Sequence, residues 1–94
     1  MSLLKDYEYM MKILYKPSFV RQYKKLPDAL RQEVMDKVTL FKEDQSHPFL
    51  RTHKLKGKME GYLSFSVNYE YRIIFQYEQD NIALVAVGNH EIYQ

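Results

Sequence analysis

The sequence has no cysteine and no tryptophan. The lack of cysteine excludes disulfides, thiolate zinc sites and cysteine nucleophiles, which agrees with a cytoplasmic protein. No apolar run is long enough to span a bilayer, and the first residues lack the apolar core of a secretion signal. Internal repeats and low-complexity tracts are also missing. We therefore expect a globular, cytoplasmic protein without a membrane segment.

The 94 residues are 46% hydrophobic and 28% charged, an ordinary balance for a folded chain. This length suits one compact domain and not two. Residues 1–10 are polar and rich in tyrosine, so we expect an N-terminal tail there, with Met10 or Met11 as an alternative start. A single domain is then expected over residues 11–94.

The net charge is only +2, which is small for a protein that binds nucleic acid. The basic residues are concentrated between Gln45 and Glu60, where four cations stand against one acid: Arg51, Lys54, Lys56 and Lys58. Such a patch suits phosphate groups. A solvated loop with ordinary surface lysines explains the same pattern, and taken alone it is the better explanation.

Two helices are expected after a short strand at residues 12–16, which Pro17 ends. Ser18 is a candidate N-cap for the first helix, in which apolar residues recur at spacings of four and three: Phe19, Tyr23 and Leu26. Asp28 is a candidate cap for the second, which carries a longer apolar stripe: Leu30, Val34, Val38 and Phe41. That stripe needs an apolar surface to cover.

From Gly61 the hydrophobic period becomes two, as in a half-buried strand, with Ser64, Ser66 and Asn68 on the polar side. Two further strands are expected at residues 71–77 and 82–87, joined by tight turns. The order β-α-α-β-β-β predicts an α+β fold, in which an antiparallel meander carries both N-terminal helices on one face. We expect the other face to be open and to expose the serines.

Three side chains stand out as candidates for chemistry: His53, Arg72 and His90. Histidine is the natural acid or base near neutral pH, although a lone histidine is more often an ordinary surface residue. Arg72 begins an apolar strand, where a guanidinium needs a partner. An internal acid such as Glu70 or Glu91 and a bound phosphate explain it equally well. No metal-binding spacing or phosphate-binding glycine loop is present.

An ordered set of short motifs resembles the RelE/ParE family of toxins: residues 53–57 (HKLKG), 61–62 (GY), 71–75 (YRIIF) and 88–93 (GNHEIY), preceded by 19–26 (FVRQYKKL). The resemblance covers nearly everything from Met11 to Gln94. It implies a RelE-like fold, a cognate antitoxin as partner and, in the RNA-cutting branch, cleavage of messenger RNA on the ribosome. In that branch the RNA's own 2′-hydroxyl attacks, without metal or cofactor.

The resemblance also implies roles for individual residues. Arg72 matches the arginine that holds the phosphate, and His90 matches a catalytic histidine that acts as general acid. His53 is the first choice for the general base and Glu70 the second. Tyr93 resembles a C-terminal aromatic that orients the base. The residues implied in contacts with RNA are Arg51, Lys54, Lys56, Lys58, Ser64 and Ser66.

The sequence departs from the family on the strand after Gly61. Some members carry lysine or histidine on its open face, where this chain has Ser64 and Ser66, which can bond a phosphate oxygen but cannot act as the general base at neutral pH. A ParE-like toxin that inhibits gyrase without nuclease activity is the main alternative, because the two branches share one fold. ParE-like members generally lack the histidine set, which favours the RNA-cutting branch. A third alternative is an inactive member that only binds an antitoxin or DNA.

Overall fold

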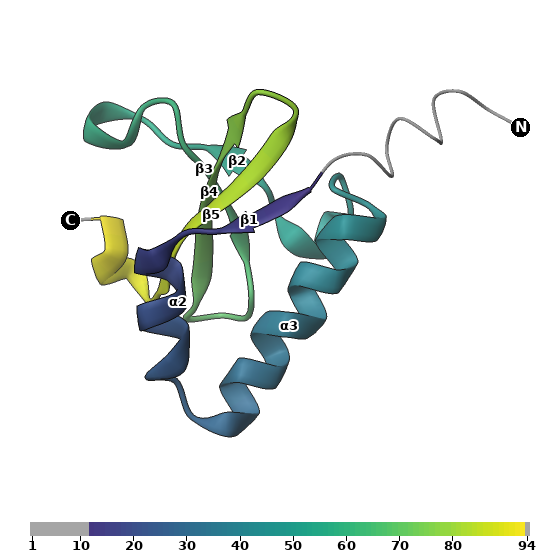
Figure 1. Ribbon diagram of the computed structural model, residues 1–94, viewed down its shortest axis with the longest axis vertical. Helices are drawn as coiled ribbons and strands as arrows, with labels where there is room; N and C mark the ends of the chain where they lie inside the picture. Colours follow the sequence, from purple (N-terminus) through teal and green to yellow (C-terminus); the bar gives the residue numbers. More distant parts are fainter. Residues whose placement is uncertain (1–11, 94) are drawn as a thin grey trace, which may run out of the picture.

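A five-stranded mixed sheet runs through the centre of the molecule in the order β1-β5-β4-β3-β2 (Figure 1). The computed structural model describes residues 12–93, so the tail expected over residues 1–10 lies outside the described residues. The strands are β1 (Ile13–Tyr15), β2 (His53–Lys54), β3 (Leu63–Ser66), β4 (Arg72–Glu78) and β5 (Asn81–Gly88). β1 pairs with β5 in parallel, and the other pairings are antiparallel.

The two predicted helices are α2 (Pro17–Lys24) and α3 (Asp28–Glu43). α2 begins two residues, and α3 one residue, before the position that the predicted caps imply, because Pro17 fits the first helical turn and Asp28 is itself helical. Ser18 therefore does not cap α2: its hydroxyl donates a hydrogen bond to the carbonyl of Val85 in β5. This bond ties α2 to the sheet.

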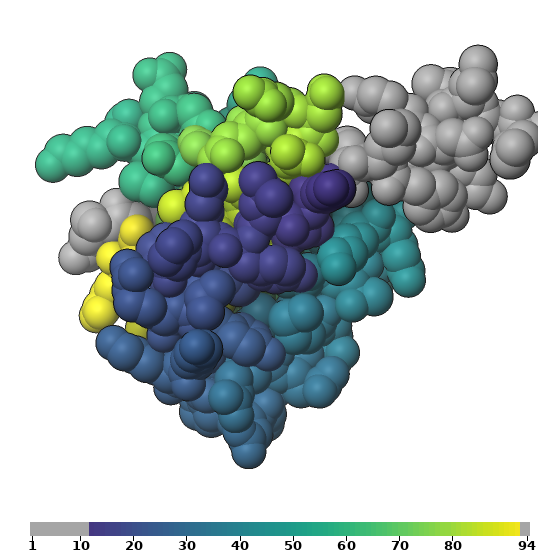
Figure 2. Space-filling model, viewed as in Figure 1, coloured from purple at the N-terminus to yellow at the C-terminus, as the bar shows by residue number. Residues whose placement is uncertain are grey.

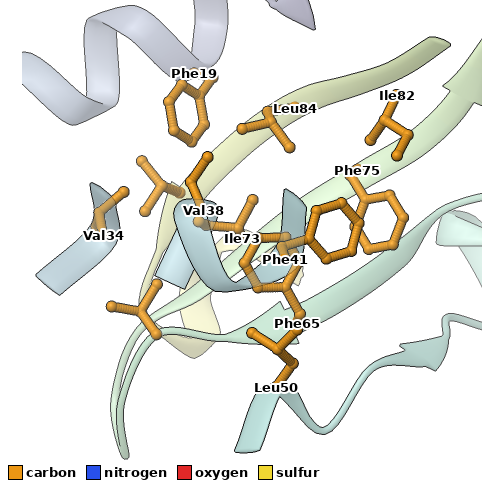
Figure 3. Close-up of a cluster of buried hydrophobic side chains, with 12 residues drawn as sticks. Phe19, Val34, Val38, Phe41, Leu50, Phe65, Ile73, Phe75, Ile82 and Leu84 are labelled. Carbon is orange, nitrogen blue, oxygen red and sulfur yellow. The ribbon is translucent and has the colours of Figure 1, made fainter. Parts of the chain in front are cut away.

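The apolar stripe of α3 packs on the sheet, as its spacing predicts (Figure 3). Phe41 is fully buried and stacks on Phe65 of β3 with 4.5 Å between ring centroids. The same ring meets the edge of Phe75 of β4 at 4.9 Å. Val34 and Val38 are also fully buried. The expected α+β fold, with two helices on one face of a sheet, is thus confirmed.

The described part of the chain also contains three short 3-10 turns: η1 (Pro48–Leu50), η2 (Gly57–Met59) and η3 (His90–Tyr93). The segment around η2 projects from the rest of the molecule (Figures 1 and 2). The last turn, η3, lies next to α2 and is coloured yellow in Figure 2. β2, only two residues long, was not predicted. No helix in the described part of the chain is long and apolar enough to cross a membrane.

The expectation that the second face of the sheet exposes its serines is wrong. Ser64 is 0% exposed and Ser66 only 7%. Both are small, and larger side chains flank them on the neighbouring strands: His53 and Ile74 pair with Ser64, and Arg72 pairs with Ser66. Side chains that stand opposite one another on paired strands lie close together, so the larger neighbours cover the serines. Ser64 therefore presents no surface for direct contact with RNA.

Candidate functional site

A pocket of about 380 Å³ lies where β3 and β4 meet η1 and α3. Its lining includes three cationic side chains, from three separate parts of the chain: Lys37, Arg51 and Arg72. No carboxylate belongs to the described lining. Beside the lining, Glu33 of α3 accepts a hydrogen bond of 3.1 Å from the side chain of Asn68, so one nearby acid stands against three cations. An excess of fixed positive charge attracts anions, most strongly those with several charged oxygens. The pocket is therefore a candidate site for a phosphate-bearing ligand.

Arg72 is the first residue of β4 and pairs with Ser66 on one side and Gly88 on the other. Its Nη1 donates a hydrogen bond to the hydroxyl of Ser66, which fixes the guanidinium on the sheet surface. The described residues include no ion pair to Arg72, although Glu70 and Glu91 were both candidate partners. The remaining N–H groups of Arg72 are therefore available to an anion in the pocket.

The other two cations reach the pocket from elements that the sequence does not link to β4. Lys37 lies on α3, and its ammonium donates a hydrogen bond of 2.8 Å to the carbonyl of Val67. Arg51 follows η1 and has a φ angle of +48°, in the left-handed region that non-glycine residues seldom adopt. Such strain is common at functional sites, where the surrounding structure maintains it.

His53 lies on the edge strand β2, opposite Ser64, and its side chain is exposed. Its Nδ1 is 3.1 Å from the carbonyl oxygen of Arg51. Strand pairing places His53 on the same sheet face as Ser66 and Arg72, because residues opposite each other or two apart share a face. Strand spacing puts the Cα atoms of His53 and Arg72 roughly 12 Å apart, too far for direct contact.

His90 begins η3, two residues after Gly88, the residue that pairs with Arg72. Its side chain is exposed. Ile92 packs closely over Gly88: a Cβ atom added at Gly88 would lie 2.2 Å from Cγ2 of Ile92. In addition, Asn89 Oδ1 accepts a hydrogen bond of 3.0 Å from the amide of Glu91. These contacts hold η3 at the strand end beside Arg72.

In the described part of the chain, no hydrogen bond joins His53, Arg72 and His90. Of the three, only Arg72 lines the cationic pocket. His53 lines a separate shallow hollow with Leu55, Lys56 and Met59. The three groups therefore do not form one pre-assembled cluster.

The remaining candidate residues are more widely spread. Glu70 is exposed in the β3–β4 turn, where its amide donates to Asn68 Oδ1 at 2.9 Å. Lys54, Lys56 and Lys58 are exposed on β2 and around η2. The side chain of Tyr93 lies outside the described part of the chain. Three pocket residues were missed by sequence reasoning: Lys37, Phe49 and Tyr69. Nothing in the local pattern distinguishes them from surface residues.

Away from this pocket, Lys16 and Glu78 form an ion pair with 2.9 Å between the ammonium nitrogen and a carboxylate oxygen. The hydrogen bond from the Lys16 ammonium lowers the pKa of the Glu78 carboxyl, and the charge of the same lysine lowers it further. Since Lys16 precedes α2 and Glu78 ends β4, the pair connects two distant segments.

A family model described as the RelE-like toxin HigB of type II toxin–antitoxin systems matches residues 7–90 of this chain. No curated protein matches by sequence.

Solved structures share the fold at low identity. A YoeB/ParE toxin from Agrobacterium tumefaciens has a TM-score of 0.69 and 21% identity, covering 85% of this chain and 99% of its own. YafQ from E. coli has a TM-score of 0.71 and 16% identity, covering 89% and 98%. A chain of the E. coli DinJ–YafQ toxin–antitoxin complex has the same score and identity, covering 87% and 94%.

Proposed function

Because this chain belongs to the HigB-like family of RelE-like toxins of type II toxin–antitoxin systems, we propose that it cleaves messenger RNA on the ribosome. The observation that carries the proposal is the cationic pocket at Arg72. A guanidinium without a carboxylate partner, beside two further cations, suits a phosphodiester that must be held while it is cut. The toxin would act in the cytoplasm, where messages are translated.

The proposed reaction is transfer of the phosphoryl group within the RNA. The 2′-oxygen of one ribose bonds to the adjacent phosphorus, and the bond from phosphorus to the 5′-oxygen of the next nucleotide breaks. The 2′-hydroxyl proton passes to a general base, and the departing 5′-oxygen takes a proton from a general acid. The products are a 2′,3′-cyclic phosphate and a free 5′-hydroxyl.

We assign these tasks to individual residues from their positions. Arg72 would hold the non-bridging oxygens as negative charge develops on them. His90, held at the strand end beside Arg72, would protonate the leaving oxygen. His53 would serve as the base from the same sheet face. Glu70 remains the alternative base, since its exposed carboxylate lies only two residues before Arg72.

A cognate antitoxin is the partner that this proposal requires. The structure of DinJ with YafQ is a toxin–antitoxin complex of a protein with the same fold. The exposed cations Lys54, Lys56 and Lys58 would favour an acidic antitoxin segment.

Expression without antitoxin tests the proposed function. We expect Arg72→Ala and His90→Ala to abolish growth arrest while both proteins still fold, as circular dichroism would verify. Arg21→Ala, an exposed arginine on α2 outside the pocket, is the matched control and should stay toxic. Message ends mapped in these cells should show cuts within translated regions. Full toxicity of both variants, or gyrase-linked DNA breaks with intact messages, would contradict the proposal.

A further inference from the structure

Two large aromatic side chains on the lining of the cationic pocket are exposed to solvent. Phe49 is 72% exposed and Tyr69 is 96% exposed. A single exposed ring is ordinary, but two large exposed rings on the lining of one pocket mark a candidate contact site. Neither ring belongs to the hydrophobic core, and neither has a role in the proposed reaction.

Phe49 is held rigidly although it is exposed. Its amide donates a hydrogen bond of 3.1 Å to Nδ1 of His47, and its ring meets the imidazole edge-on at 4.8 Å. Pro48 precedes it, and Leu50, which follows it, is fully buried. A ring fixed in this way loses little conformational entropy when a flat ligand stacks on it.

Tyr69 projects from a turn that is also well defined. Asn68 Oδ1 accepts hydrogen bonds of 2.9 Å from the amides of both Glu70 and Tyr71. The turn therefore presents the Tyr69 ring from the β3–β4 side of the pocket, while η1 presents Phe49 from another element.

We propose that this pocket is a nucleotide-binding subsite for single-stranded RNA, in which Phe49 and Tyr69 stack on bases and Arg51 and Lys37 bind the intervening phosphates. The inference rests on the proposed function and extends it to the nucleotides beside the cut. The lining combines rings and cations, the two kinds of group that bind the bases and the phosphates of a single strand. Three cations without a carboxylate favour a polyanion.

Binding can be measured apart from cleavage. The probe is a short fluorescein-labelled single-stranded oligonucleotide with 2′-O-methyl riboses, which lacks the attacking hydroxyl, and the readout is fluorescence anisotropy. Phe49→Leu and Tyr69→Leu remove the ring and should each raise Kd by about tenfold. Phe49→Tyr and Tyr69→Phe keep the ring and should bind like the unmodified protein. Tyr15→Leu, a partly exposed tyrosine on β1, which β5 separates from β4 and β3, is the aromatic control.

The charge contribution has its own readout. Arg51→Ala should reduce the slope of log Kd against log salt by about 0.7, the value for one phosphate contact on a single strand. Arg21→Ala should leave that slope unchanged, because Arg21 does not line the pocket.

Three results would overturn the subsite: no binding of the probe by the unmodified protein, unchanged Kd in both leucine variants, or an equal loss in Tyr15→Leu. Leucine variants that still bind RNA with full affinity but no longer bind an acidic antitoxin peptide would also overturn the RNA subsite. That result would assign the pocket to the antitoxin. Failure of the proposed function looks different. A protein that binds the probe through Phe49 and Tyr69 but cuts no message on ribosomes would retain the subsite and lose the nuclease.

Discussion

Replacement of Arg51 by glycine should strengthen the fold while it weakens RNA binding. Arg51 has a φ angle of +48°. A left-handed conformation costs an L-residue about 1–2 kcal/mol, which glycine does not incur. Glycine in turn loses about 0.5–1 kcal/mol more backbone entropy on folding. The net gain is about 0.5–1 kcal/mol, or a rise in Tm of about 2–8 °C for a domain of this size.

The chain supplies a matched control for this substitution. Gln79 in the β4–β5 turn has a φ angle of +56°, is exposed, and does not line the cationic pocket. Gln79→Gly should raise Tm by a similar amount and leave RNA binding unchanged. Arg51→Ala should bind RNA as weakly as Arg51→Gly without the gain in stability, because alanine retains the strain.

Thermal unfolding followed by circular dichroism, together with RNA anisotropy, measures both effects on the same samples. A lower Tm for Arg51→Gly would mean that the arginine side chain supports the fold and is not held in the pocket for a ligand. Equal RNA affinity for Arg51→Gly and the unmodified protein would remove Arg51 from the proposed subsite.

Three further substitutions test other parts of the structure. Phe41→Ala should lower the free energy of unfolding in urea by about 3–5 kcal/mol, since it empties the centre of the core; a loss below about 1 kcal/mol would mean that the core closes around the gap. Gly88→Ala should lower the free energy of unfolding by about 1–3 kcal/mol and reduce growth arrest. The new Cβ would lie 2.2 Å from Cγ2 of Ile92 and displace η3 together with His90. Unchanged toxicity would mean that the position of η3 is not critical. Glu78→Gln should reduce the loss of stability on acidification. The folded-state pKa of Glu78 is below its ordinary 4.5, so the Lys16 pair stabilises the fold above that value and loses its effect as pH falls through the lowered pKa. Urea midpoints between neutral pH and about pH 3 measure this, and parallel curves for both proteins would contradict it.

Periodicity predicted the elements whose burial depends on local spacing. The stripe that ends at Phe41 follows the helical repeat, so the face of α3 that packs on the sheet could be identified from the sequence. The alternation from Gly61 likewise assigned Phe65 to the core side of β3. In each case the residues on one face are neighbours within a single element.

Strand pairing decided what the sequence pattern could not. Ser64 is buried because of the side chains opposite it on β2 and β4, and that register is a long-range property. The cationic pocket has the same origin, since Lys37, Arg51 and Arg72 come from α3, the end of η1 and β4. Lys37 looks like an ordinary surface cation in its own segment, whereas Arg51 and Arg72 were already candidates from the sequence. Only the fold brings the three together.

The proposed cut, by attack of the adjacent 2′-hydroxyl on a phosphate held by Arg72, leaves characteristic RNA ends. They can be analysed after incubation of the purified toxin with ribosomes that carry a defined message. We predict an upstream fragment that ends in a 2′,3′-cyclic phosphate and a downstream fragment with a 5′-hydroxyl, and no cut when the ribose before the scissile phosphate is 2′-deoxy. Cleavage that persists at the deoxy site, or equal cleavage by Arg72→Ala, would contradict the mechanism.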